Sequence, residues 1–121
     1  MGSMRKIVSL DGNIKIMVAD EPGEACHLYY MGKAKDPIGR PAGEFGHVEF
    51  QNGPINERGV NGCQHEDLLV IVIDRLEHFQ KGKFNCREND LALTKIQEAL
   101  HWLEARTKDR VKRGVEGTSM R

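Results

Sequence analysis

The chain lacks long apolar runs, an excess of either charge, and closely spaced cysteines. No apolar stretch approaches the roughly 20 residues that a membrane-spanning helix requires, and no charged start precedes an apolar export segment. Its 18 basic side chains balance 18 acidic ones, unlike a basic domain that binds duplex nucleic acid. We therefore expect a cytoplasmic protein without membrane or duplex nucleic acid partners.

Cysteine is also scarce. Cys26, Cys63 and Cys86 are far apart and odd in number, which favours free thiols over a disulfide framework. The nearby histidines do not provide the paired spacing of a zinc module, so ordinary thiols and surface histidines explain them. No nucleophile motif or paired-carboxylate motif stands out either. The sequence thus predicts no catalytic residue, no metal site and no cofactor.

The length of 121 residues suits one domain with a modest core. Residues 1–3 precede a second methionine, Met4, and resemble an expression scar, so they are set apart from the fold. We predict a single α+β domain over residues 4–121, with a small N-terminal antiparallel β-sheet followed by a long antiparallel two-helix hairpin. Its expected parts are the sheet over 4–51, a loop over 52–62, the helical hairpin over 63–114 and a tail over 115–121.

Four β-rich segments make up the expected sheet. Apolar and other side chains alternate from Ile14 to Val18, which is typical of a strand with one apolar face. A turn around Gly12 joins this strand to the preceding one. The predicted strands are Lys6 to Leu10, Ile14 to Val18, Cys26 to Met31 and Gly46 to Gln51, and the segment from Gly32 to Gly46 is predicted to be a long loop.

The stretch from Gln64 to Arg113 predicts two helices folded back on each other. The first contains six consecutive apolar residues, Leu68 to Ile73, and Leu76 and Phe79 continue the pattern at helical spacing. A bend is expected at Lys81 to Phe84. Because the apolar run covers more than one helix face, it predicts burial against both its own chain and another subunit.

The second helix has clear start and stop signals. We expect Asn85 to be its N-cap, paired with Glu88 in a capping box, and Gly114 to end it. Past Leu103, five of the eight residues from Arg106 to Arg113 are cationic, so this end either is solvated or meets an anion.

Two pairs of side chains are candidate ligand contacts. Phe79 and Asn89 border the bend, where a ring can stack on a nucleobase and a carboxamide can bond to adenine. The simpler interpretation, which composition favours, is that Phe79 packs the bend and Asn89 is solvated. Arg106 and Arg110 lie four residues apart on one helix face and form either a phosphate clamp or a solvated surface.

The connector over residues 52–62 has four glycines or prolines in eleven positions. Glycine lets the backbone approach a ligand closely, and exposed amides attract phosphate oxygens. An ordinary connector explains the same composition.

Short segments spread from Val48 to Thr118 carry a family resemblance. They are Val48 to Ile55, Gly59 to Gly62, Ile73 to Leu76, Phe79-Gln80, Asn89 with Leu91 to Leu93, Trp102-Leu103, Arg106-Thr107 and Gly114 to Thr118. This set resembles the phage Thoeris anti-defence sponge family, whose helical-hairpin domain is shared with the phage anti-CBASS cyclic-nucleotide sponge. The N-terminal sheet makes the chain more similar to the anti-Thoeris branch.

The resemblance implies a non-catalytic sponge that sequesters cyclic nucleotide immune signals without cleaving them. It would block Thoeris and, as a second candidate system, CBASS in the host bacterial cytoplasm. The implied main ligands are glycocyclic ADP-ribose isomers, held in pockets shared between two protomers. Phe79 and Asn89 match the stacking and hydrogen-bonding positions of that pocket. Arg58 and Asn61 are implied to contribute from the loop.

A second implied site holds the phosphates of cyclic trinucleotides. Arg106 and Arg110 match the phosphate-binding arginines of that site, and cyclic dinucleotides are further candidate ligands. The implied assembly is a homo-oligomer, either a dimer or a hexamer built as a trimer of dimers.

Two other functions stay open at this point. A small enzyme that degrades cyclic nucleotides would need an acid or base near the hairpin, for which His78 and His101 are candidates. An oligomeric interaction module would use the hairpin only as a bundle and its basic end to contact nucleic acid or an acidic partner.

Overall fold

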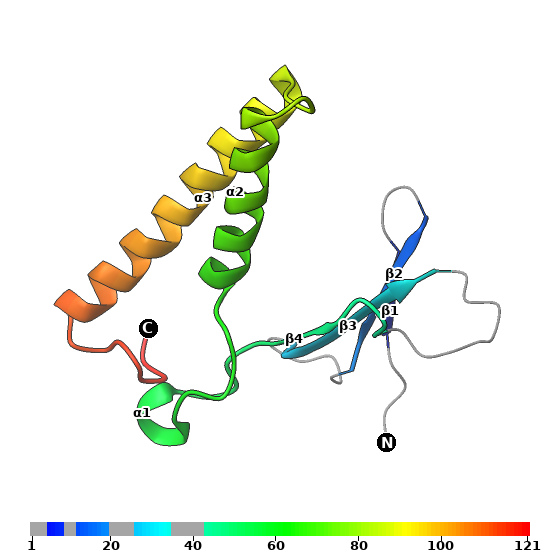
Figure 1. Cartoon of the computed structure of the whole chain (residues 1–121). Helices are drawn as coiled ribbons and strands as arrows, with labels where there is room; N and C mark the ends of the chain where they lie inside the picture. Colours follow the sequence, from blue (N-terminus) through cyan, green and yellow to red (C-terminus); the bar gives the residue numbers. More distant parts are fainter. Residues whose placement is uncertain (1–4, 9–11, 20–25, 35–42) are drawn as a thin grey trace. The chain divides into compact units, whose positions relative to one another are not determined.

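The computed structural model describes residues 5–8, 12–19, 26–34 and 43–121 of the chain (Figure 1). These residues form two compact units. One comprises the described residues up to Asn52 with Val60–Cys63, and the other comprises Gly53–Gly59 with Gln64–Arg121. The expected scar, residues 1–3, lies outside the described residues, and the single domain over 4–121 stays a prediction.

The first unit is a four-stranded antiparallel sheet with strands in sequence order. The hairpin expected around Gly12 is confirmed, because β1 pairs with β2 and Gly12 adopts a φ of 77°, which favours glycine. The strands are β1 (Arg5–Val8), β2 (Ile14–Val18), β3 (Leu28–Lys33) and β4 (His47–Glu49).

The core of this unit is small and centres on Val18. Val18 is completely buried at the end of β2, where its Cα partner in β3 is Tyr29. The Tyr29 ring packs edge-on against Phe50, with ring centroids 5.7 Å apart. Phe50 in turn forms an isolated parallel bridge with Cys63, which brings the end of the 52–62 loop back to the sheet.

The predicted loop from Gly32 to Gly46 is wrong at its start, because β3 continues through Gly32 to Lys33. The Glu44 carboxylate accepts a hydrogen bond from the Lys33 amide at 2.9 Å. A Cβ at position 32 would lie 2.4 Å from Glu44 Oε2, so glycine leaves room for this carboxylate instead of breaking the strand. Residues 35–42 of the predicted loop lie outside the described residues.

The second unit contains the helical hairpin. It comprises α1 (Ile55–Arg58), α2 (His65–Lys81) and α3 (Arg87–Lys112). The two long helices run antiparallel and pack on each other (Figure 1). A sheet followed by a helical hairpin confirms the predicted α+β fold class. The Asp67 carboxylate accepts from the Gln64 amide at 2.8 Å and so satisfies a donor at the start of α2.

The N-cap predicted for the second helix is wrong by one residue. Cys86 is the N-cap, and its Sγ accepts from the Asn89 amide at 3.4 Å. Asn85 instead donates from Nδ2 to the Gly82 carbonyl at 2.8 Å, so its side chain closes the bend and is not placed to cap α3. The predicted stop is confirmed, because Gly114 follows the C-cap with a φ of 75°.

The long helices bury very little in this chain alone. No residue of α2 is buried, and Ile71 is 65% exposed in the middle of its apolar run. On α3, Trp102 is also 65% exposed. No helix in the described part of the chain combines the length and the hydropathy that a membrane span needs.

Candidate functional site

The hairpin bend brings together the aromatic side chains of Phe79 and Phe84. Their ring centroids are 5.8 Å apart, and the ring planes are tilted by 36°. The Arg75 guanidinium lies 4.8 Å from the centroid of the Phe79 ring, one helical turn earlier on α2. Phe84 is exposed and Phe79 is half-buried. The bend therefore presents a partly exposed aromatic surface with a cation beside it.

Asn89 joins this cluster from the first turn of α3. Its Nδ2 donates to the Phe84 carbonyl at 3.3 Å, and its backbone amide bonds to Cys86. Within the described part of the chain, Asn89 Oδ1 accepts no hydrogen bond. The two predicted residues Phe79 and Asn89 thus meet at Phe84, one through its ring and the other through its carboxamide. This geometry combines a stacking surface with a hydrogen-bond acceptor.

Gln80 also holds this bend together, and sequence reasoning named it only within the Phe79-Gln80 segment of the resemblance, without a role. Its Oε1 accepts from the Cys86 amide at 3.2 Å, and its Nε2 donates to the Cys86 carbonyl at 3.0 Å. One carboxamide thereby ties the last turn of α2 to the N-cap of α3. Its position six residues before the N-cap of α3 was the only local signal, and it is not specific.

We expect Gln80→Ala to lower the free energy of unfolding by about 1 kcal/mol, because two hydrogen bonds across the bend are lost and water replaces them only in part. Denaturant unfolding monitored by helical circular dichroism measures the change. Gln97→Ala is the matched control, since Gln97 is an exposed glutamine within α3. Equal effects of the two substitutions would contradict this role of Gln80.

Arg58 lies at the end of α1, the short helix that follows Pro54. Its side chain is exposed, and its stem lies across Gly53. A Cβ at position 53 would be 2.4 Å from Arg58 Cδ, and Gly53 adopts a φ of 85°. Glycine at this position is therefore needed both for the turn and for the placement of Arg58.

Asn61 belongs to the sheet unit and closes the loop there. Its Oδ1 accepts from the Asn52 amide and its Nδ2 donates to the Asn52 carbonyl, both at 2.8 Å. The Asn61 amide also donates to Gln51 Oε1 at 3.0 Å. These bonds occupy both ends of the Asn61 carboxamide. The same two asparagines line an open hollow of about 330 Å³, with His27, Leu28, Glu49 and Phe50.

Arg106 lines an open cleft of about 460 Å³ in the helical unit. The Arg106 side chain is exposed, and the cleft reaches the start of α2 at Gln64 and Glu66. A guanidinium beside the amides of a helix start is a favourable setting for an anion. The acidic side chain of Glu116, also in the cleft wall, opposes it. The full set of lining residues is Gln64, His65, Glu66, Leu103, Arg106, Thr107 and Glu116.

Arg110 lies in a different environment from Arg106, although both occupy one helix face as predicted. Arg110 is only 6% exposed, and its guanidinium makes four hydrogen bonds to the C-terminal tail. Nε bonds to the Glu116 carboxylate at 3.1 Å. The other nitrogens donate to the carbonyls of Val115, Thr118 and Met120. The structure therefore does not present the two arginines as one open pair.

The bend and α1 lie at opposite ends of the helical unit (Figure 1). Asn89 and Arg110 both belong to α3, and the 21-residue rise between them is roughly 31 Å. The α1 helix lies near the Arg110 end of α3. The Asn56 amide of α1 donates to the carbonyl of Gly117, in the tail that follows α3, at 2.9 Å. Within one chain, Arg58 is therefore too far from Phe79 and Asn89 to share a small ligand.

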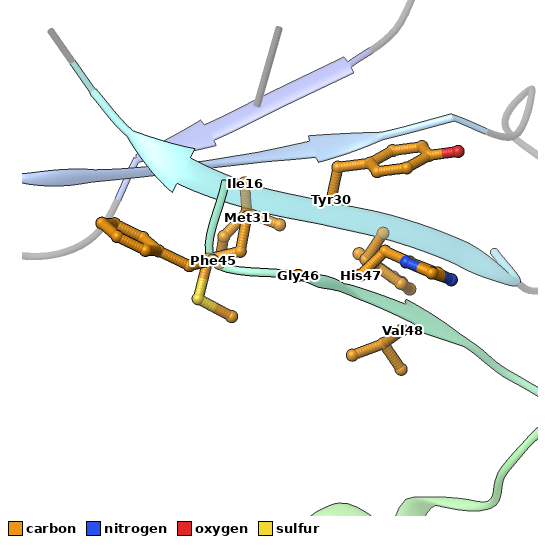
Figure 2. A pocket seen from close by; sticks show the side chains of 8 residues that line it. Ile16, Tyr30, Met31, Phe45, Gly46, His47 and Val48 are labelled. Atoms are coloured by element: carbon orange, nitrogen blue, oxygen red, sulfur yellow. The ribbon is translucent and has the colours of Figure 1, made fainter. Parts of the chain in front are cut away.

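The sheet unit carries an apolar hollow of about 120 Å³ that sequence reasoning did not find. Figure 2 shows Met31 and Phe45 close together among the residues that line it, with Ile16 from the neighbouring strand. Phe45 is 53% exposed and Met31 is 38% exposed. The remaining lining residues are Tyr29, Tyr30, Gly46, His47 and Val48.

The candidate catalytic histidines lie on the helix surfaces. His78 and His101 are both exposed, and His78 Nδ1 lies 2.8 Å from the Asp74 carbonyl. His101 packs edge-on against Trp102. Among the residues that the structure describes, no group of three or more His, Cys, Asp or Glu side chains could hold a metal ion.

Comparison with known proteins places the hairpin in a known group of sequences. Residues 44–108 match the family described as the Acb2/Tad1 hairpin domain. A relative from Bacillus phage SBSphiJ7, named Thoeris anti-defense 1, is 56% identical over 77 residues. The matched part covers 64% of this chain and 54% of the relative, so the chain spans about half the length of that protein. The family match includes Phe79, Asn89 and Arg106 but ends before Arg110.

Proposed function

Because the chain belongs to the Acb2/Tad1 hairpin-domain family, we propose that it is a phage anti-defence sponge, which binds cyclic nucleotide immune signals and holds them without cleaving them. Acting in the host bacterial cytoplasm, it would keep a Thoeris effector inactive by removing its signal. CBASS signals are a second candidate target. The relative supports the Thoeris assignment, because its name is Thoeris anti-defense 1.

The bend cluster is the proposed site for glycocyclic ADP-ribose isomers, and the meeting of Phe79 and Asn89 at Phe84 is the observation that carries this proposal. An adenine ring stacks on the aromatic surface, and its amino group donates to Asn89 Oδ1. Arg75, beside Phe79, supplies a cation for the pyrophosphate. Nothing in this arrangement requires a reacting group.

A second protomer would complete this pocket. Arg58 lies at the end of the unit opposite the bend, and an antiparallel pair of hairpins would bring Arg58 of one protomer to the bend of its partner. The same pairing would cover the apolar residues of α2, because no residue of this helix is buried in one chain. We therefore propose a homodimer, with a hexamer as a trimer of dimers as the larger assembly. Asn61 is proposed to contribute to the same pocket from the loop over residues 52–62, which its hydrogen bonds to Asn52 close.

The cleft beside Arg106 is the proposed site for the phosphates of cyclic trinucleotides or dinucleotides. Arg106 is exposed and contacts the phosphate directly. Arg110 pairs with Glu116 of the cleft wall and so offsets the carboxylate that would repel a phosphate. Symmetric copies of this end would place several such guanidinium groups around one cyclic ligand.

Arg106→Ala is expected to weaken binding of a cyclic trinucleotide by roughly 10- to 100-fold, because charge-assisted hydrogen bonds to phosphate are lost. Binding of glycocyclic ADP-ribose should be unchanged, since Arg106 is not among the residues proposed to contact that ligand. Isothermal titration calorimetry with both ligands measures the two effects. Lys108→Ala is the control for lost charge, because Lys108 is an exposed cation that does not line the cleft.

The proposal as a whole is tested by ligand recovery. Protein of measured mass is incubated with glycocyclic ADP-ribose, washed, and denatured by heat, and the released nucleotide is analysed by mass spectrometry. A sponge releases the intact ligand in a fixed ratio to the protein. Release of a hydrolysed product would instead favour the degrading enzyme, and no retained nucleotide would favour the interaction module.

A further inference from the structure

The C-terminal tail forms a joint with α1. The Asn56 amide of α1 donates to the Gly117 carbonyl at 2.9 Å, and Asn56 Nδ2 lies 3.5 Å from the Glu116 carbonyl. Gly117 adopts a φ of 79°, and a Cβ there would be 2.7 Å from Asn56 Oδ1. The tail and α1 therefore fit together closely at a glycine that no larger residue can replace without strain.

Arg110 holds the same tail segment from the side of α3. Its four hydrogen bonds end on Glu116 and on the carbonyls of Val115, Thr118 and Met120. Val115, which is only 8% exposed, also donates its amide to the Arg110 carbonyl at 3.0 Å. The residues that meet Asn56 thus lie within the segment that Arg110 fixes.

Because Arg110 is buried, its hydrogen bonds and the position of the C-terminal tail depend strongly on each other. A buried guanidinium needs partners for its donors, and the tail supplies them. No buried side-chain nitrogen or oxygen among the described residues lacks a hydrogen bond. If the tail is displaced, the cation loses these partners, so an ordered tail and a bound Arg110 require each other.

We propose that Arg110 is a positioning residue, which through the tail segment 115–118 holds α1 in place and with it Arg58. The consequence for ligand binding rests on the proposed function, in which Arg58 completes the ADP-ribose-type pocket of a partner protomer. Arg110 is then coupled, through Arg58, to the ligand that is bound at the bend of the partner protomer. Its role at that site is to place another residue, and it does not touch the ligand.

Amide hydrogen exchange followed by NMR tests the positioning step without any ligand. Arg110→Ala should speed exchange at Asn56 by about tenfold or more, because the carbonyl that accepts its amide bond is no longer held. Exchange at Leu76, in the middle of α2, should stay unchanged, whereas a general loss of stability would speed exchange at both. Gly117→Ala, which keeps Arg110 intact and strains the joint itself, should give the same local change.

Arg113→Ala is the matched control for Arg110→Ala. Arg113 follows α3 directly, and its side chain bonds to Asp109 and to the Arg121 carbonyl, beyond the segment that meets α1. Asn56 should therefore exchange at the wild-type rate in this variant. Unchanged exchange at Asn56 in both Arg110→Ala and Gly117→Ala would overturn the proposal, and equal acceleration in Arg113→Ala would do the same.

Calorimetry with glycocyclic ADP-ribose tests the consequence. Arg110→Ala and Gly117→Ala should both weaken binding about tenfold or more, and Arg58→Ala is expected to have the same effect. Faster exchange at Asn56 with wild-type affinity would overturn the link between α1 and the ligand. If the wild-type protein binds no glycocyclic ADP-ribose, the proposed function fails, and the exchange rates still decide whether Arg110 positions α1.

Discussion

Phe79→Ala is expected to weaken binding of glycocyclic ADP-ribose by roughly 10- to 100-fold, the usual worth of one aromatic stacking partner for a nucleobase. Removal of the ring also leaves Phe84 without its neighbour at 5.8 Å and Arg75 without the ring that it covers. The stacking surface is therefore lost as a unit. Calorimetry at constant protein concentration measures the change in Kd.

Asn89→Ala tests the other half of the same site. It keeps both rings but removes the carboxamide that donates to the Phe84 carbonyl and offers Oδ1 to the base. A loss of similar size is expected, because a buried polar group of the ligand then lacks a partner. The double substitution should abolish measurable binding.

Asn85→Ala is the matched control in the bend. Asn85 also donates to a backbone carbonyl, that of Gly82, but it lies outside the aromatic cluster. Its replacement should lower stability slightly and leave the Kd within about twofold of wild type. Wild-type affinity in both Phe79→Ala and Asn89→Ala would refute the bend as the ligand site.

Ile71→Glu is expected to separate the proposed oligomer into single chains and to abolish binding of glycocyclic ADP-ribose. Ile71 lies in the apolar run of α2 and is 65% exposed in one chain, so a partner that covers it would have to bury the new carboxylate. Light scattering measures the mass, and calorimetry measures binding. The two losses should occur together, since the pocket is proposed to be shared.

Lys95→Glu is the control for the added acid, because Lys95 is an exposed residue of α3 whose side chain only pairs with Glu98 at 4.0 Å. It should keep the wild-type mass and affinity. A monomeric wild-type protein that binds glycocyclic ADP-ribose tightly would show that the pocket does not need a second protomer. Wild-type mass in Ile71→Glu would show that α2 pairs through another face.

The sequence was informative where a pattern has one physical meaning. The apolar run from Leu68 to Ile73 is too long, with its helical flanks, for an ordinary strand, and it lies in α2. Alternation from Ile14 to Val18 corresponds to β2 without change. Gly114 ends the second helix as expected, because a glycine after a basic last turn is typical of a helix C-terminus.

The sequence was less informative where more than one residue could fill the same structural role. Asn85 is a better N-cap than Cys86 by intrinsic preference, but the bend uses the Asn85 carboxamide to satisfy Gly82. Similarly, glycine at position 32 indicated a loop, whereas the strand needs glycine to admit Glu44. Both errors depend on contacts that form only after the chain has folded back.

The candidate site shows the same division. Phe79 and Asn89 were predicted to border the bend, and they do, because a helix start and a helix end fix their places. The burial of Arg110 was not predictable from its spacing to Arg106. It depends on the path of residues 115–120, whose carbonyl groups are present in every sequence and carry no signal of their own.

If the hairpins pair as proposed, the scarcity of buried residues in one chain would make folding depend on the protein concentration. In the proposed assembly, each tenfold dilution lowers the free energy that holds two chains together by about 1.4 kcal/mol. A ligand that binds only the paired form opposes this loss by mass action. The immune signal would therefore draw dilute chains into the folded state, so that its arrival increases the amount of protein able to capture it.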